Sequence, residues 1–224
     1  MVGQIRLFCI VLFAAIMPNG IVASTGETEE ENKHHGIGLT GELTSGTTWQ
    51  MEVSYHWFPI QYVGIGASLG LWKQIGGDES PATEEWRISE DSHNITNGYF
   101  MPSLLFRTPA LIKTEDVKIG LMAEPGCMMN VPYDKVSLEK TYGTGIPIEQ
   151  EKISYHKGNW LAFNFRVGIY TSFDNITMSL GYVYSDLDIY AMRRNMRYDN
   201  IHFSGFYPKR KAVGGLYVKV SLAL

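Results

Sequence analysis

The sequence predicts an all-β protein, an eight-stranded antiparallel up-and-down transmembrane β-barrel. Three observations predict this fold. In eight segments apolar and polar residues alternate with a period of two, which gives each strand one apolar face. Short and long connections follow one another between these segments, as in a barrel built from hairpins. The face opposite the apolar one carries charged residues beside glycines, a composition that suits a narrow barrel interior.

Residues 1–23 have the pattern of a secretory signal peptide. A positive Arg6 precedes a short apolar run that is broken at Pro18, as is typical of a cleaved signal. Residues 24–35 are polar and acidic, which predicts a flexible leader. The predicted barrel domain spans residues 36–224.

Segments 36–45, 48–58 and 61–73 predict the first three strands. Apolar side chains occupy alternate positions in all three, and in the first of them Ile37 and Leu39 share a face. The opposite face of the third segment is rich in glycine, which leaves room for larger side chains inside a barrel.

Segments 98–108 and 116–128 predict the fourth and fifth strands, with less regular patterns. Pro102 removes a hydrogen-bond donor from the fourth segment. The fifth segment alternates at its start, but Pro125 and Gly126 predict that it bends or ends there.

Segments 159–172, 175–187 and 215–224 predict the last three strands, and each alternates cleanly. An α-helix would scatter these apolar residues around its axis, whereas a strand collects them on one face. One face of the last segment is formed by Leu216, Val218, Val220, Leu222 and Leu224.

The connections predict which end of the barrel faces outward. Short periplasmic turns and longer external loops are typical of outer-membrane barrels, and an even number of strands places both termini in the periplasm. The short connections are residues 59–60, 110–115 and 173–174, and the long ones are 74–97, 129–158 and 188–209; residues 46–47 are the exception, a short connection in the external set.

The polar face is expected to line the lumen. A soluble barrel would turn its apolar face inward instead, and that alternative stays open because alternation alone fits both. Ten aromatic residues near strand ends favour the membrane, where aromatic girdles mark the two interfaces: Trp49, Trp57, Phe58, Tyr62, Trp72, Tyr99, Trp160, Tyr170, Tyr182 and Tyr184. The predicted lumen charge network, which would fill the interior with salt bridges, consists of Glu42, Glu52, Arg107, Lys118, Glu124, Arg166 and Lys219.

With its signal peptide, eight alternating segments and terminal strand, the chain resembles the outer-membrane β-barrel family of Gram-negative bacteria, the small porin-family barrels that include the OmpA transmembrane domain and OmpX. The resemblance implies residence in the bacterial outer membrane, among outer-membrane lipid and lipopolysaccharide. It also implies insertion by the barrel assembly machinery, although the chain ends in Leu224 where such proteins often end in Phe or Tyr. We expect a monomer.

The last long loop is basic. Arginine forms forked hydrogen bonds to phosphate, so this loop predicts either contact with lipopolysaccharide or an ordinary solvated surface. The residues concerned are Arg193, Arg194, Arg197, Lys209, Arg210 and Lys211. The net charge of −4 gives no electrostatic support for a nucleic-acid partner. No metal or cofactor is expected.

Three functions stay open. The first is a structural or adhesive role through the long external loops, in a barrel whose lumen is filled by charged side chains. The second is a porin-like channel for small solutes. The third is a lipid-modifying enzyme that would use Ser54, His56 and Glu52, but residues two apart on a strand lie about 7 Å apart, too far for a direct hydrogen bond. We therefore expect no catalytic residues, and the ligand of the loops is left unknown.

Overall fold

The computed structural model describes residues 34–45, 47–74, 85–89, 92, 94–141, 146–199, 201–207, 209 and 212–224. The predicted signal peptide and residues 24–33 of the predicted leader lie outside the described residues. Two units are distinguished within the chain, and everything below concerns the unit that begins at Lys33. Among the described helices, none is long and apolar enough to cross a membrane.

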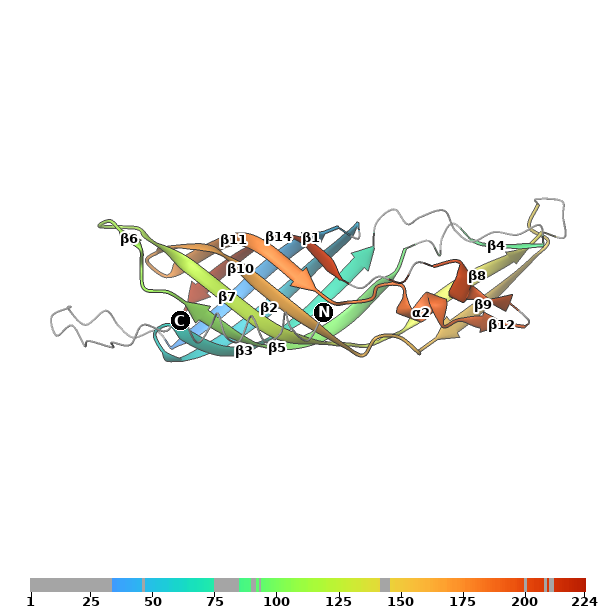
Figure 1. Cartoon of the computed structure of the whole chain (residues 1–224), viewed down its shortest axis with the longest axis horizontal. Helices are drawn as coiled ribbons and strands as arrows, with labels where there is room; N and C mark the ends of the chain where they lie inside the picture. The colour runs from blue at the N-terminus through green and yellow to red at the C-terminus, as the bar shows by residue number, and fades with distance from the viewer. Residues whose placement is uncertain are drawn as a thin grey trace. The chain divides into compact units, whose positions relative to one another are not determined.

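Eight antiparallel strands close into an up-and-down barrel (Figure 1), which confirms the predicted fold class. Each strand pairs with its neighbours in the chain, and the ring closes because the first strand pairs with the last, from Gly36 opposite Ala223 to Thr44 opposite Gly215. The barrel strands are His35–Thr44 (β1), Thr48–Ile60 (β2), Val63–Gln74 (β3), Thr96–Arg107 (β5), Lys118–Asn130 (β7), Leu161–Phe173 (β10), Ile176–Ser185 (β11) and Val213–Ala223 (β14).

The two prolines disturb the ladder without ending a strand. β7 continues past Pro125 to Asn130, so of the two predicted outcomes there, a bend or an end, the end is wrong. Instead, the pairing between β5 and β7 is interrupted around Pro102 and Pro125, although its register stays the same on both sides. Proline has no N–H to donate, and β7 is held here by its other neighbour, β10, which pairs with it without a break.

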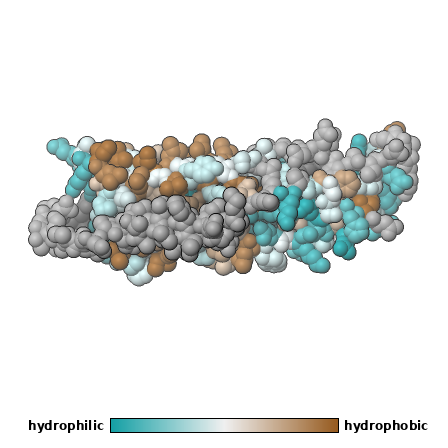
Figure 2. Space-filling model, viewed as in Figure 1, coloured by the Kyte–Doolittle hydropathy of each residue, from teal (hydrophilic) through white to brown (hydrophobic). Residues whose placement is uncertain are grey.

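The outward face of the barrel is apolar. Exposed aliphatic and aromatic side chains line every barrel strand, and Figure 2 shows them gathered over the barrel while hydrophilic residues cover the elements beyond one end. On the described barrel strands, charged or imidazole side chains of the outward face occur only near strand ends, at His35 and Lys73. The strands have 10 to 13 residues, and about 9–11 tilted residues suffice to cross a bilayer.

The predicted aromatic girdle is only partly correct. Trp57, Trp160 and Tyr182 are exposed on the outer surface, as a girdle requires. Four of the ten aromatic residues instead point into the lumen and are buried: Phe58, Trp72, Tyr99 and Tyr170. Their positions near strand ends do not reveal this, because successive residues of a strand point to opposite faces.

The described parts of the long connections contain strands and a helix. Strands Trp86–Ile88 (β4), Asp134–Lys140 (β8) and Glu149–Tyr155 (β9) form a three-stranded sheet in the order β4-β8-β9. The third connection contains the helix Ala191–Arg194 (α2), the strands Arg197–Tyr198 (β12) and Ile201–His202 (β13), and the 3-10 turn Phe203–Gly205 (η2).

These external elements share an apolar core. Trp86 and Ile88 of β4, Val136 and Leu138 of β8, and Phe203 of η2 are buried together in it. The three long connections therefore contribute to one folded region at one end of the barrel.

At the opposite end, the connection between β5 and β7 contains the short strand Ile112–Lys113 (β6), which pairs with β7.

Glycines on β10 and β11 allow a close approach of the two strands, and this generates a prediction. Gly181 lies opposite Gly168. A Cβ added at Gly181 would collide with the carbonyl oxygen of Val167 and would lie 2.5 Å from Cα of Gly168 and 2.9 Å from the Tyr217 ring. We expect Gly181→Ala to reduce the free energy of unfolding by about 1–3 kcal/mol, because the strands must shift.

Urea unfolding of the full chain folded in detergent micelles would measure this change. Gly41→Ala is the matched control, since nothing lies within 4 Å of a Cβ added at Gly41. Equal stabilities of the two variants would contradict the close approach of β10 and β11.

Candidate functional site

A single guanidinium at the centre of the lumen holds carboxylates from three other strands. Arg166 of β10 is fully buried and donates hydrogen bonds to Glu42 of β1 and, over 2.7 Å, to Glu52 of β2. Its Nη1 also lies 3.6 Å from Glu124 of β7. Lys219 of β14 completes the group with a 2.8 Å bond from Nζ to Glu124. Five strands thus meet in one ion-pair network.

Neutral side chains complete the hydrogen bonding of these carboxylates. The Tyr99 hydroxyl donates to Glu52 Oε2 over 2.9 Å, and Ser68 donates to Glu52 Oε1 over 3.2 Å. Ser103 donates to Glu124 over 3.2 Å. A buried charge is tolerable only when it is paired and hydrogen-bonded, and both Glu52 and Glu124 meet this requirement.

Buried amide groups lie on the external side of the charges. Gln50 is two residues from Glu52 toward the external end of β2, and Asn164 has the same relation to Arg166 on β10. Both side chains are buried, and no described protein group satisfies either amide. Buried polar groups of this kind are usually met by ordered water, so this part of the lumen is polar but enclosed.

Apolar side chains fill the lumen on both sides of the charges. Toward the end of the barrel opposite α2, Phe58, Leu105, Met122 and Tyr170 belong to one buried cluster. The Arg107 guanidinium lies over two of these rings, 4.9 Å from the centroid of Phe58 and 5.7 Å from that of Tyr170.

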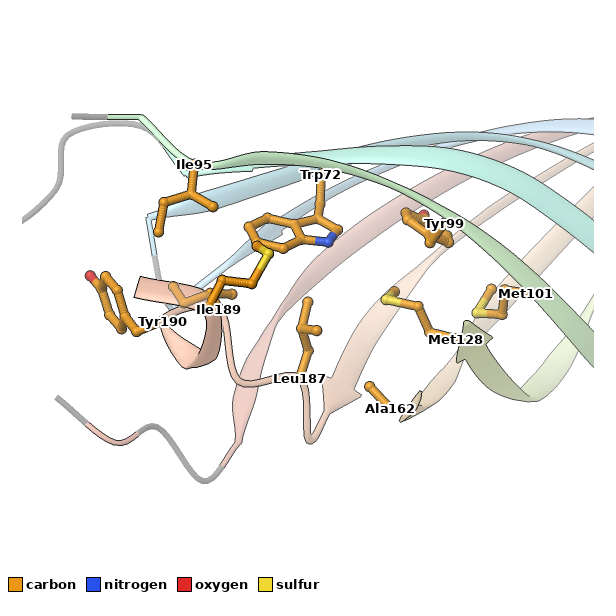
Figure 3. Packing of buried hydrophobic residues seen from close by; sticks show 10 residues of the cluster. Trp72, Ile95, Tyr99, Met101, Met128, Ala162, Leu187, Ile189 and Tyr190 are labelled. Carbon is orange, nitrogen blue, oxygen red and sulfur yellow. The ribbon is translucent and has the colours of Figure 1, made fainter. Parts of the chain in front are cut away.

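The external mouth is closed by a larger cluster. Figure 3 shows Trp72, Tyr99 and Met128 from the barrel wall meeting Leu187 and residues near α2. Two hydrogen bonds fix this layer: the Trp72 indole donates to Asn130 over 3.1 Å, and the Gln74 amide donates to the Tyr190 hydroxyl. The full cluster consists of Trp72, Ile95, Tyr99, Met101, Met128, Ala162, Leu187, Ile189, Tyr190 and Met192.

The external elements have a buried ion pair of their own. Arg193 of α2 donates to Asp134 of β8 over 2.8 Å and also binds the backbone carbonyls of Ser92 and Asn94. Burial alone would lower the pKa of Arg193, but Asp134 outweighs this effect and raises it. Beside it, Arg194 forms an ion pair with Asp188. These contacts join all three long connections.

The structure separates the predicted lumen residues into two groups. Glu42, Glu52, Glu124, Arg166 and Lys219 come together in the ion-pair network described above. Arg107 instead stacks on the Phe58 and Tyr170 rings at the end of the barrel opposite α2. Lys118 lies at the first residue of β7, half-buried and opposite Lys113 and Ser172. The predicted charge network did not include His56, Ser68, Tyr99 and Ser103, which bind its carboxylates from the inward face of their strands.

The predicted basic surface is also divided. Arg193 was expected at the surface, but it is buried, because Asp134 and two carbonyls form its site. Arg194 is half-buried and paired, whereas Arg197 and Lys209 are exposed. Arg210 and Lys211 lie outside the described residues.

The side chains considered for catalysis do not form a catalytic triad. Ser54 donates weakly to the carbonyl of Gly38 over 3.5 Å. His56 Nε2 lies 3.3 Å from Ser103 Oγ and 3.2 Å from Glu124 Oε1. A triad needs the nucleophile and the acid on different nitrogens of the histidine ring, but both groups here meet the same nitrogen. Among the described residues, no group of three or more His, Cys, Asp or Glu side chains is placed to hold a metal ion.

Comparisons with known proteins find similar folds only. No protein-family model matches the chain, and no curated protein sequence matches it. The solved structure of Neisserial surface protein A is 9% identical, with a TM-score of 0.43, over 85% of this chain and 96% of that one. The outer-membrane enzyme PagL is 11% identical (TM-score 0.41; 84% and 99% covered), and a major outer membrane protein from Thermus thermophilus is 8% identical (0.42; 85% and 98%).

The ion-pair network predicts a large effect of removing its central cation. Arg166→Met would leave Glu42 and Glu52 buried without their main partner, and we expect a loss of about 3–5 kcal/mol in the free energy of unfolding. Urea unfolding in micelles measures it. The control is Arg87→Met, which breaks an Arg87–Glu139 pair whose arginine is exposed and should cost less than about 1 kcal/mol. A similar cost for both variants would contradict a buried network.

The external ion pair predicts a local effect. Arg193→Met leaves Asp134 buried and unpaired, so the external elements should become sensitive to protease while the barrel stays folded. Limited proteolysis with mass spectrometry would locate the cuts in the external region, and Arg197→Met is the exposed control. Protection equal to that of the unmodified chain would show that Arg193 does not hold these elements together.

Proposed function

We propose that the chain is an integral protein of the bacterial outer membrane with a closed lumen, and that it acts through its folded external region in a structural or adhesive role. The observation that carries this proposal is the layering of the lumen, in which an ion-pair network lies between apolar clusters. A lumen of this size is filled by side chains in small barrels of this type.

The outer surface supports the membrane part of the proposal. An uninterrupted apolar face around a barrel has a large cost in water, because contiguous exposed apolar patches on soluble proteins rarely exceed a few hundred Å². Lipid removes this cost. The orientation follows from the connections, since short turns are typical of the periplasmic side and long ones of the exterior.

The external region supports the surface role. Its sheet, α2 and η2 have their own apolar core and their own buried ion pair, so the three long connections present a fixed surface. Rigid presentation reduces the entropy lost on binding a partner. We propose that this surface meets lipopolysaccharide and a further ligand outside the cell.

A channel for small solutes is the second candidate, because buried amides and charges give part of the lumen a polar lining. A lipid-modifying enzyme is the weakest of the three candidate functions, since Ser103 and Glu124 meet the same nitrogen of His56. A conducting state would require displacement of Trp72 and the residues packed against it.

Planar-bilayer recordings test the closed lumen. With the full chain reconstituted in about 1 M KCl, where exposed charges are largely screened, we expect no steady openings, because both ends of the lumen are packed. Insertion is checked on the same preparation by the difference in gel mobility between unheated and boiled protein. Steady openings from inserted protein would favour the channel, and recovery of the folded chain in the aqueous fraction would refute the membrane proposal.

A further inference from the structure

We propose that the lumen binds one alkali metal cation between Glu42 of β1 and Gln50 of β2, with the hydroxyl of Thr40 beside them. These three side chains are called the lumen cation site. The inference goes beyond the proposed surface role, because it requires only the folded barrel and its enclosed polar layer.

The ion-pair network contains more negative than positive groups. Its carboxylates are Glu42, Glu52 and Glu124, and its cations are Arg166 and Lys219, so one negative charge is left over. All five side chains are buried. A buried charge has a large cost in free energy unless a group of opposite sign lies next to it. The network therefore requires one further positive charge.

The uncompensated charge lies on Glu42. Both carboxylate oxygens of Glu52 accept hydrogen bonds, and so do both of Glu124. Glu42 differs from them, because Arg166 bonds its Oε1 while no described protein group bonds its buried Oε2. The further positive charge is thus needed at Oε2 of Glu42.

A proton on His56 would not meet this need. Nε2 of His56 lies 3.2 Å from Glu124, whose other oxygen already holds Lys219. In the register between β1 and β2, His56 is opposite Gly36, which is about 20 Å from Glu42 along the strand. A protonated His56 would balance the sum of the charges and still leave Oε2 of Glu42 without a partner.

Neutral oxygen atoms lie beside Glu42. Gln50 is directly opposite Glu42 in the register, and both side chains are buried on the inward face. Directly opposite residues on one face have Cβ atoms about 4.5–5.5 Å apart, which places the Gln50 amide within reach of Glu42. Neither that amide nor the hydroxyl of Thr40, two residues from Glu42 on the same face, has a partner among the described protein groups.

The chemistry of these groups selects a hard cation with a single charge. Carboxylate, amide and hydroxyl oxygens are ligands of hard cations, whereas softer metals prefer histidine and cysteine. A divalent ion would carry more charge than one free carboxylate oxygen balances. A water molecule would satisfy the hydrogen bonds but not the charge. Arg166 bonds the other oxygen of Glu42, so the carboxylate separates the two positive charges.

The lumen cation site is shielded from solvent. Thr40, Glu42 and Gln50 are 0%, 3% and 1% exposed. Gln50 is also opposite Trp72, which belongs to the cluster that closes the external mouth in Figure 3. A cation enclosed in this way would exchange slowly in the folded barrel, so the experiment supplies it while the chain folds.

The test measures how the stability of the folded chain depends on cation concentration. The full chain is folded in non-ionic micelles in NaCl or KCl, with N-methylglucamine chloride holding the ionic strength constant so that screening does not change. A ligand of the folded state alone stabilises that state by mass action. In at least one of the two salts, the folding equilibrium constant from urea unfolding should rise about tenfold for each tenfold rise in concentration above the dissociation constant.

Two variants with the same chemical change locate the site. Gln50→Leu removes the amide beside Glu42 and keeps every ion pair, and the equilibrium constant should then change by less than about twofold over the same range. Gln74→Leu also removes a buried amide, but that amide bonds Tyr190 in the mouth cluster. This control should lose stability and keep the full cation dependence.

A second measurement counts the ion directly. Equilibrium dialysis with radioactive sodium or rubidium, after folding in its presence, should find about one ion per folded chain. Glu42→Gln should bind none. The fold of every variant is checked by the mobility of unheated protein, and if Glu42→Gln does not fold, Gln50→Leu carries the test.

Four results would each overturn the lumen cation site. They are the absence of a sodium or potassium effect in the unmodified chain, equal dependence in Gln50→Leu and the unmodified chain, loss of the dependence in Gln74→Leu, and stronger stabilisation by MgCl2 at the same ionic strength. The bilayer recordings test the closed lumen separately, so either proposal can fail without the other.

Discussion

The burial of Arg166 is the interaction on which the rest of the barrel depends. A guanidinium taken out of water needs carboxylates at short range, and these come from β1, β2 and β7. The network therefore constrains strands that are not neighbours in the ring. A slip of one residue in any of these strands would turn its carboxylate toward the outer surface. The charges thus specify register in the middle layer of the lumen, between the two buried apolar clusters.

The same packing of side chains stabilises the barrel and closes its lumen. Side chains large enough to fill the interior need small residues opposite them, and Gly70 and Gly120 provide this space beneath the rings of Tyr99 and Tyr170. Above the charges, the external layer is built partly from the barrel wall and partly from the last long connection. The external region and the barrel are consequently linked by packing at Trp72 and Leu187 as well as by the chain.

The strands were predictable because a period of two is a local signal, and all eight lie close to their predicted bounds. Pro125 did not end its strand as the sequence suggested. Whether a proline ends a strand depends on the neighbouring strands, and here β10 pairs with β7 on both sides of Pro125. The alternation of apolar and polar residues also identified the charged side chains that face the lumen. It did not reveal that Arg107 stacks on aromatic rings instead of joining the ion-pair network. The sequence showed that Phe58 and Trp72 lie near strand ends. It did not show that their side chains point into the lumen and not toward the outer surface. The external sheet escaped prediction since its short strands are stabilised by contacts distant in sequence. The burial of Arg193 could not be predicted for the same reason, because its partner Asp134 is distant in the sequence and is brought near only by the fold.

The pairing of β1 with β14 has a consequence for how the molecule is made. Residues 36 and 223 must meet before the ring is complete, so the final ladder joins the earliest and latest parts of the barrel to be synthesised. Until that seam forms, both of its strands present unpaired N–H and C=O groups, which attract other chains and cannot be left bare in hydrocarbon. The barrel thus has no stable half. Its unfinished form has two open edges at once, and its finished form has no unpaired barrel strand at which unfolding can begin.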